Sequence, residues 1–166
     1  MRVSALLFCL LTAGSCWSQI ADLDPDWKEL EVPPPAKFSA ERMVPIEMPR
    51  YVTVKVGVDP ESLSIGADGI VRYVLIAQSS NGNINAMYEG IWCRKGEVKT
   101  YARLASDGKW DPVDDAQWSP LNGNLRSMHA LAFARQGACD GRATAARTPQ
   151  EIIRRLKRSQ FDGIQN

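Results

Sequence analysis

The central part of the chain alternates hydrophobic and polar positions with a period of two, the pattern of β-strands with one buried face. Residues 51–58 carry valine at every second position, and residues 97–104 alternate in a similar way. Residues 70–77 are apolar apart from Arg72, as in a central strand covered on both faces. Further strands are predicted at residues 62–65 and 85–93. Because the connections are short, we expect an antiparallel meander.

Two helices are predicted to follow the strands. Asn124 is expected to cap the first, whose apolar residues recur with helical spacing until Gly137. The second begins at Thr148, where a threonine cap is followed by Pro149 in the first helical position and by Glu151. We therefore predict an α+β fold, in which a small, mostly antiparallel sheet is covered by one or two C-terminal helices.

Residues 1–18 have the layout of a secretory signal peptide. Arg2 precedes a short apolar run, and small residues follow it. The run is too short to cross a bilayer as a permanent helix. We expect cleavage between Ser18 and Gln19 and a periplasmic location. The alternatives are lipidation at Cys16, which would give an outer-membrane lipoprotein, and an uncleaved anchor.

Residues 19–50 are acidic and rich in proline, so we expect an extended or irregular arm. Its apolar residues are expected to hold the arm against the domain, and a loose linker is the alternative. The length that remains suits one domain with a single core. We place that domain at residues 51–160 and a short tail at residues 161–166.

The formal charge argues against some classes of partner. The net charge is +1, and it becomes zero when Arg2 leaves with the signal peptide. A neutral chain has no overall basic field to hold nucleic acid. We therefore expect no nucleic-acid partner, and no transmembrane span after processing.

Two cysteines, Cys93 and Cys139, remain if cleavage follows Ser18. An even pair in an oxidising compartment is expected to form a disulfide. On the chain-entropy model, a loop of this size stabilises a fold by about 4 kcal/mol. Two buried thiols or a redox pair are the alternatives, but a redox pair usually has close spacing and an activating neighbour.

His129 is the only histidine, so any catalytic triad or histidine metal site must be built around it. We interpret it as a partly buried packing residue, and we expect no metal and no cofactor. The tryptophans are widely spaced in the sequence, and we interpret them as core and loop anchors rather than as a carbohydrate platform. Those after residue 18 are Trp27, Trp92, Trp110 and Trp118.

Charged residues interrupt two of the apolar strands. Arg72 and Glu89 fall on neighbouring strands, so one interpretation pairs them across the sheet. The other places Arg72, Glu89 and Arg103 in a groove that holds a polar ligand. The candidate binding residues are Arg72, Glu89, Tyr101, Arg103 and His129.

Several short motifs occur in order along the chain. They are residues 64–73 (SIGADGIVRY), residues 88–93 (YEGIWC), Tyr101 followed by residues 107–110 (DGKW), and His129–Ala130 ahead of Cys139. Over about residues 51–139 the chain resembles the CNP-one-like domain family of exported Gram-negative bacterial proteins. That family is uncharacterised, so the resemblance implies export, a two-cysteine domain and no named activity. Trp92 stands where the family's pattern leads us to expect Arg, so no role of that Arg is carried over.

The order of strands and turns is also similar, in pattern alone, to small envelope domains of the surface-adhesin E type. We therefore expect a non-enzymatic binding or interaction domain whose partner is an unknown envelope protein or envelope component. One alternative is a hydrolase that uses Glu89 and His129. The other is a lipoprotein assembly factor anchored at Cys16.

Overall fold

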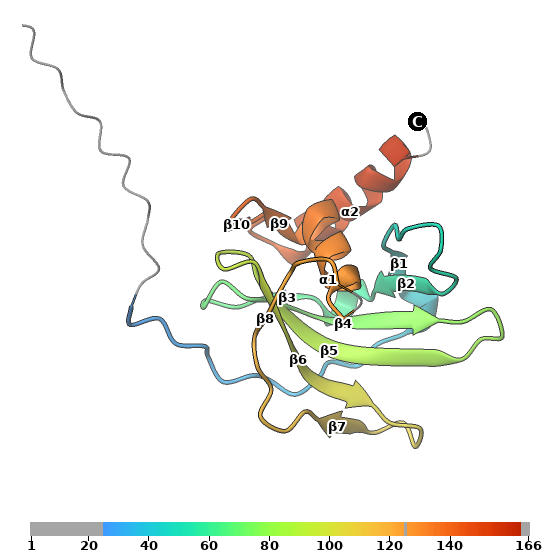
Figure 1. The fold of residues 1–166 in the computed structure, drawn as a ribbon, viewed down its shortest axis with the longest axis horizontal. Helices are drawn as coiled ribbons and strands as arrows, with labels where there is room; N and C mark the ends of the chain where they lie inside the picture. The colour runs from blue at the N-terminus through green and yellow to red at the C-terminus, as the bar shows by residue number, and fades with distance from the viewer. Residues whose placement is uncertain (1–24, 125, 164–166) are drawn as a thin grey trace, which may run out of the picture.

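The computed structural model describes residues 25–124 and 126–163. The expected signal peptide, its cleavage site at Ser18 and Gln19, and Cys16 lie outside these residues. Eight strands form one sheet in the order β1-β2-β4-β5-β6-β7, with β3 paired to β4 and β8 paired to β6 (Figure 1). Every pairing is antiparallel. The predicted α+β fold with a mostly antiparallel sheet is confirmed.

The described chain contains ten strands and five helical elements. The strands of the large sheet are β1 (Val44–Pro45), β2 (Lys55–Val58), β3 (Ser64–Ile65), β4 (Val71–Gln78), β5 (Ile84–Trp92), β6 (Glu97–Leu104), β7 (Trp110–Pro112) and β8 (Ser119–Pro120). A small hairpin is formed by β9 (Cys139–Asp140) and β10 (Ala143–Thr144). The helical elements are η1 (Ala40–Arg42), η2 (Pro60–Ser62), α1 (Met128–Phe133), η3 (Ala134–Ala138) and α2 (Pro149–Gly163).

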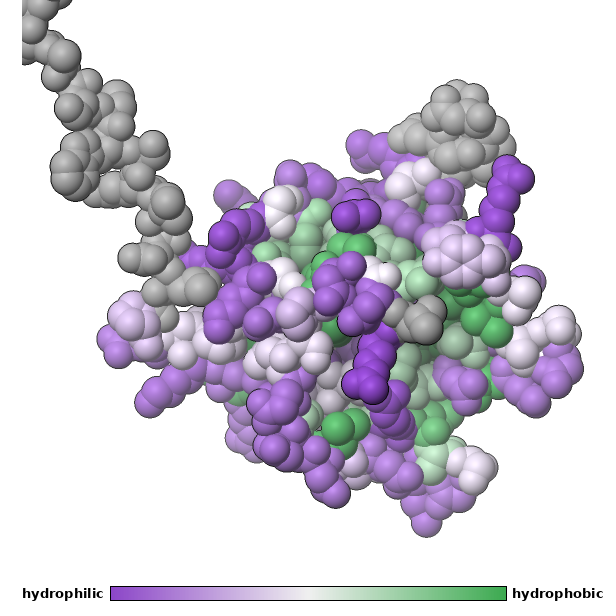
Figure 2. Space-filling view, viewed as in Figure 1, coloured by the Kyte–Doolittle hydropathy of each residue, from purple (hydrophilic) through white to green (hydrophobic). Residues whose placement is uncertain are grey.

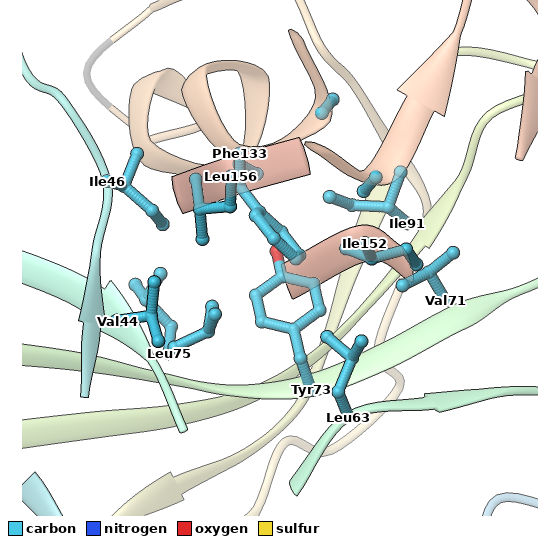
Figure 3. Packing of buried hydrophobic residues seen from close by; sticks show 14 of the residues in the cluster. Val44, Ile46, Leu63, Val71, Tyr73, Leu75, Ile91, Phe133, Ile152 and Leu156 are labelled. Atoms are coloured by element: carbon cyan, nitrogen blue, oxygen red, sulfur yellow. The ribbon is translucent and has the colours of Figure 1, made fainter. Parts of the chain in front are cut away.

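The helices cover one face of the sheet. Figure 1 shows α1 and α2 on one side of the strands and the N-terminal segment along the other. On the helical side, Tyr73 of β4 meets Phe133 of α1 edge-on, with 4.7 Å between the ring centroids. Ile152 and Leu156 of α2 are fully buried in the same core (Figure 3). Burial of these side chains holds the helices on the sheet.

The N-terminal segment lies on the opposite face. Val32 and Phe38 pack against a second apolar cluster that includes Val74 and Tyr88 of the sheet. Glu29 forms an ion pair with Lys99 of β6 at 2.9 Å. Residues 25–43 therefore cover the face of the sheet that the helices leave open, and we call this segment the arm.

The strand predicted at residues 51–58 is wrong over its first half. The Val52 N–H donates to the Pro49 carbonyl at 2.8 Å, which makes a turn where the pattern predicted a strand. Tyr51 is 70% exposed, and β2 begins only at Lys55. The strands expected at 70–77, 85–93 and 97–104 are confirmed to within one residue at each end.

The first predicted helix is wrong in its extent. Only Met128–Phe133 is α-helical, and Ala134–Ala138 continues it as a π-helical turn. The Asn124 side chain accepts a hydrogen bond from the Ser127 N–H at 3.1 Å, which closes a local turn instead of starting the helix. The chain therefore enters α1 three residues later than the pattern predicted, with Ser127 rather than Asn124 in the cap position.

The second helix begins as predicted. The Thr148 hydroxyl accepts a hydrogen bond from the Glu151 N–H at 3.3 Å, and Pro149 opens the helix. The Glu151 carboxylate accepts from the Arg147 N–H. α2 continues to Gly163, beyond residue 160, where we expected the domain to end.

The predicted disulfide is present between Cys93 and Cys139. Cys93 directly follows β5, a central strand, and Cys139 follows η3, so the bond ties the sheet to the helical segment. Within the described residues no helix is long and apolar enough to cross a membrane. Figure 2 shows hydrophilic side chains over most of the face viewed in Figure 1.

Candidate functional site

Glu89 is a buried carboxylate in the middle of the sheet, with an exposed fraction of 2%. It lies on β5, opposite Tyr73 of β4 on one side and Thr100 of β6 on the other. The register between β5 and β6 shifts between Tyr88 and Glu89, which is a β-bulge. Bulges re-aim side chains next to functional sites.

Three donors surround this carboxylate. The Tyr73 hydroxyl donates to Oε2 at 2.9 Å, and the Thr100 hydroxyl donates to Oε1 at 3.2 Å. Nε2 of His129 lies 3.1 Å from both oxygens. In the part of the chain whose side chains are described, Glu89 has no Lys or Arg partner. Its charge is therefore stabilised by two hydroxyls and one imidazole.

The contact with Glu89 determines which ring nitrogen of His129 carries a proton. A carboxylate only accepts hydrogen bonds, so Nε2 of His129 carries the proton that the two groups share. In the neutral ring Nδ1 is then an acceptor, and in the charged ring it is a second donor. The imidazole is 14% exposed, and it lines a cavity. Glu89 is thus a positioning group for the ring.

Tyr73 joins the site to the core. Burial raises the pKa of its hydroxyl well above the ordinary value, and the neighbouring charge of Glu89 raises this pKa further. The hydroxyl therefore stays protonated and donates permanently to the carboxylate. Figure 3 shows the Tyr73 side chain rising from its strand, with its oxygen directed toward Phe133 and the helices.

The cavity beside these groups has a volume of about 710 Å³, and we call it the Glu89–His129 cavity. Strands β5 and β6 contribute Glu89 and Thr100. Residues 113–120, which lead from β7 into β8, contribute a second side. Asn124, Arg126, Ser127 and His129 contribute a third. Figure 1 shows this connection running along the sheet from β7 toward α1.

The charges around the cavity differ in how well they are paired. The Asp115 carboxylate accepts a hydrogen bond from Gln117 at 2.7 Å, and Asp115 adopts a positive φ of 48°. Arg103 contacts the sulfur of Met87 at 2.9 Å. Among the described side chains, no carboxylate pairs with the guanidinium of Arg103 or of Arg126. The cavity therefore has two exposed guanidinium groups that form no ion pair among the described side chains.

The structure separates the five candidate residues into two groups. Glu89, Arg103 and His129 line one cavity, whereas Arg72 and Tyr101 lie on the arm side of the sheet. Arg72 stands opposite Gly90 rather than Glu89, so its side chain is on the other face and neither the predicted pairing nor the predicted groove forms.

Arg72 belongs instead to the network that holds the arm. Its guanidinium makes two hydrogen bonds to Asp68, at 2.6 and 3.1 Å. Tyr101 donates to Glu29 of the arm at 2.7 Å. A Cβ at Gly90 would lie 2.5 Å from the Tyr101 hydroxyl oxygen, so glycine is needed there for this close approach.

Three of the tryptophans come together although they are far apart in the sequence. Trp27 stacks on Trp92 with 3.6 Å between the ring centroids. Trp92 meets Trp118 at 5.9 Å. Trp27 and Trp92 also line a second cavity of about 710 Å³, whose buried carboxylate is Asp68, the partner of Arg72. They anchor the arm to the sheet, which agrees with the interpretation as anchors.

Sequence reasoning missed two of the three partners of Glu89. Tyr73 and Thr100 are ordinary strand residues by pattern, and only the strand register places them opposite Glu89. Arg126 and Asp115 reach the cavity from irregular segments, where no periodic pattern predicts the direction in which a side chain points. Among the described residues, no three His, Cys, Asp or Glu side chains are grouped so that they could hold a metal ion.

Comparison with known proteins identifies the family. A family model described as "CNP1-like family" matches residues 22–157, which include the whole arm and almost the whole domain. The chain belongs to the CNP1-like family. The resemblance drawn from the motifs is confirmed, and the CNP1-like match also includes Asp22 to Arg50, ahead of the stretch in which we found motifs.

A curated relative is Cryptic neisserial protein 1 of Neisseria gonorrhoeae (strain ATCC 700825 / FA 1090), which is 30% identical over 125 residues. The similar region covers 64% of this chain and 61% of that protein. No solved structure matches this CNP1-like chain. These comparisons give a family of uncharacterised function.

Proposed function

We propose that this CNP1-like protein is an exported, non-enzymatic binding protein of the cell envelope, and that its ligand occupies the Glu89–His129 cavity. The observation that carries the proposal is the buried Glu89 carboxylate, which holds His129 at the edge of an open cavity.

A buried carboxylate does not have to be there for stability. Burial of a charge costs free energy that hydrogen bonds only offset, and apolar side chains of similar size often serve a core as well or better. Ionisable groups buried at a cleft are therefore candidates for function. Glu89 meets this description, because its bonds orient a histidine that faces the cavity.

The elements around the cavity suit a binding site. β5 and β6 are long central strands, and rigid strands hold Glu89 and Thr100 in place. Residues 113–120 are mostly irregular, and binding residues often lie on loops held by a rigid scaffold. The volume also falls within the range of about 300–1,000 Å³ that is usual for small-molecule sites.

Export is supported by two features of the chain. The pattern of residues 1–18 is that of a signal peptide. The Cys93–Cys139 disulfide is of the kind that persists in oxidising compartments such as the periplasm.

Intact mass after expression in a Gram-negative host tests the export proposal. We expect a chain that begins at Gln19 and gains two hydrogen atoms on reduction of its one described disulfide. A mass beginning at Met1 that does not change on reduction would contradict export, whereas a mass beginning at Met1 with the disulfide present would favour the uncleaved anchor. Acyl chains on Cys16 would replace the periplasmic proposal with the lipoprotein alternative.

A blocked-cavity variant tests the binding proposal. Ser119 is exposed at the cavity lining and makes no side-chain hydrogen bond among the described residues, so Ser119→Trp fills the space without removing a contact. The matched control is Ser106→Trp in an exposed turn outside the cavity. Thermal unfolding is measured with a panel of neutral, anionic and cationic small molecules.

Binding to the folded state raises the unfolding temperature. We expect at least one compound to raise it for the natural protein and for Ser106→Trp, but not for Ser119→Trp. The proposal is overturned if no compound raises it, or if the shift is unchanged in Ser119→Trp.

The contact between Glu89 and His129 also favours a second candidate, a hydrolase in which His129 acts as general base. A base held by a carboxylate is the usual arrangement for proton transfer. The assay is hydrolysis of nitrophenyl esters and phosphates, with His129→Gln as the variant. Turnover that is lost in a stably folded His129→Gln protein would establish the hydrolase, and binding without turnover would reject it.

A further inference from the structure

The charged groups that line the cavity differ in the hydrogen bonds and ion pairs that they make within the protein. Glu89 has three donors, and Asp115 accepts from Gln117. Arg103 and Arg126 line the same cavity, and among the described side chains neither is paired with a carboxylate. These two guanidinium groups are therefore available to a ligand of opposite charge.

Unpaired guanidinium groups favour a particular chemistry. Arginine presents its N–H donors in a planar fork that matches the oxygens of a carboxylate or a phosphate. Nδ1 of His129 adds one polar contact: it accepts from a ligand hydroxyl in the neutral ring, and donates to an anion in the charged ring. Both states suit an anion that also carries hydroxyl groups.

We infer that the Glu89–His129 cavity takes a small hydroxylated organic anion, whose carboxylate or phosphate binds Arg103 and Arg126 and whose hydroxyl group meets His129. This inference rests on the proposed binding function and names its ligand class. Neutral polyols and organic cations are not expected to bind well, because they form no ion pair with the two guanidinium groups.

Calorimetric titration of the full protein with four small probes tests the inference. Glycerol 3-phosphate and glycerate carry an anion and hydroxyl groups, glycerol lacks the anion, and ethanolamine replaces it with a cation. We expect the two anions to bind, and glycerol and ethanolamine not to bind.

Arginine variants locate the contact. Arg103→Ala and Arg126→Ala are each expected to weaken anion binding by roughly tenfold or more, the loss typical of a charge-assisted hydrogen bond. Both side chains are exposed, so the fold is retained, and this is checked by thermal unfolding. Arg135→Ala is the matched control, because Arg135 is exposed in η3 and is not among the residues that line the cavity.

The outcomes separate the inference from the function on which it rests. Binding of glycerol or ethanolamine that is lost in Ser119→Trp would overturn the anion class and leave the binding function standing. Anion binding that is unchanged in both arginine variants would also overturn the inference. If none of the four probes binds, the inference fails, and the wider panel used with Ser119→Trp decides the binding function.

Discussion

At the scale of the residue, the network around Glu89 sets what His129 can do. Glu89 accepts hydrogen bonds from Tyr73 and Thr100, and it also contacts Nε2 of His129. The neutral ring is therefore expected as the Nε2–H tautomer. Because His129 is the only histidine, nitrogen NMR of the imidazole reports it without ambiguity. Signals of the Nδ1–H tautomer would contradict the geometry of the site.

A second prediction concerns the hydrogen bonds of the carboxylate itself. In Glu89→Gln an amide group replaces one acceptor oxygen, which leaves a buried donor opposite other donors. We expect the free energy of unfolding to fall by about 1–3 kcal/mol. Chemical denaturation measures this loss. Glu47→Gln, at an exposed position, is the control and should change stability by less than about 0.5 kcal/mol.

The sequence drew attention to Glu89 and His129 separately, but it did not pair them except in the enzymatic alternative. Their contact depends on strand register and on the start of α1 at Met128. The pattern predicted a helix capped by Asn124, whereas the chain makes a turn there and α1 begins only at Met128. The side-chain turn at Asn124 therefore explains why this part of the site could not be predicted.

At the scale of the element, the arm is held by specific contacts rather than by composition alone. Trp27 stacks on Trp92, and its indole N–H donates to the Asp68 carbonyl at 3.0 Å. We expect Trp27→Ala to release the arm and to increase proteolysis or hydrogen exchange in residues 27–38. Trp27→Phe keeps a stacking ring and should have a smaller effect. Equal protection in all three proteins would show that the stack does not hold the arm.

The arm also gives the fold a dependence on pH. Burial alone would raise the pKa of Asp68, but hydrogen bonds from Arg72 and from the backbone of Leu30 and Ile70 outweigh it and lower this pKa. For Asp59, burial is again outweighed, here by Arg42 and by backbone hydrogen bonds, and the pKa is lowered.

A carboxyl group with a lowered folded pKa contributes stability above its unfolded pKa, which is about 3.9 for Asp. That contribution is lost as the pH falls through the folded pKa. We therefore expect the free energy of unfolding to decline below about pH 4. The decline should be shallower in Asp68→Asn, and denaturation at a series of pH values measures it. An unchanged slope in that variant would contradict the role of Asp68.

Patterns of the sequence predicted the strands better than the arm. A continuous apolar run predicted β4, whose residues Val71–Ile76 are buried, and alternation predicted β6. Proline density argued against a long helix in residues 19–50, and the described part of this range has none. It did not predict the path that the arm takes across the sheet. The arm's path depends on contacts such as the ion pair of Glu29 with Lys99, 70 residues away in the chain.

At the scale of the whole molecule, the disulfide ties the sheet to the helices. Cys93 and Cys139 are 46 residues apart in the chain. Opening a loop of this size is expected to lower the free energy of unfolding by about 4 kcal/mol on the chain-entropy model. Denaturation of the double variant Cys93→Ser, Cys139→Ser measures the loss. Stability equal to that of the natural protein would show that the packing of Phe133 and Leu156 suffices.

The α+β architecture and the disulfide were predictable because they follow from periodicity and from an even number of cysteines. The cavity was not, because residues 113–120 and Arg126 reach it from segments without a repeating pattern. The proposed ligand site is this cavity, with Glu89 and His129 at its edge.

The most direct test is the imidazole spectrum of His129 during titration with glycerol 3-phosphate, in the natural protein and in Ser119→Trp. We expect the Nδ1 signal of the natural protein to shift until the site is saturated, and the signal of Ser119→Trp not to respond. A ring signal that stays fixed in the natural protein, for this probe and for every compound of the wider panel, would contradict the proposed ligand site.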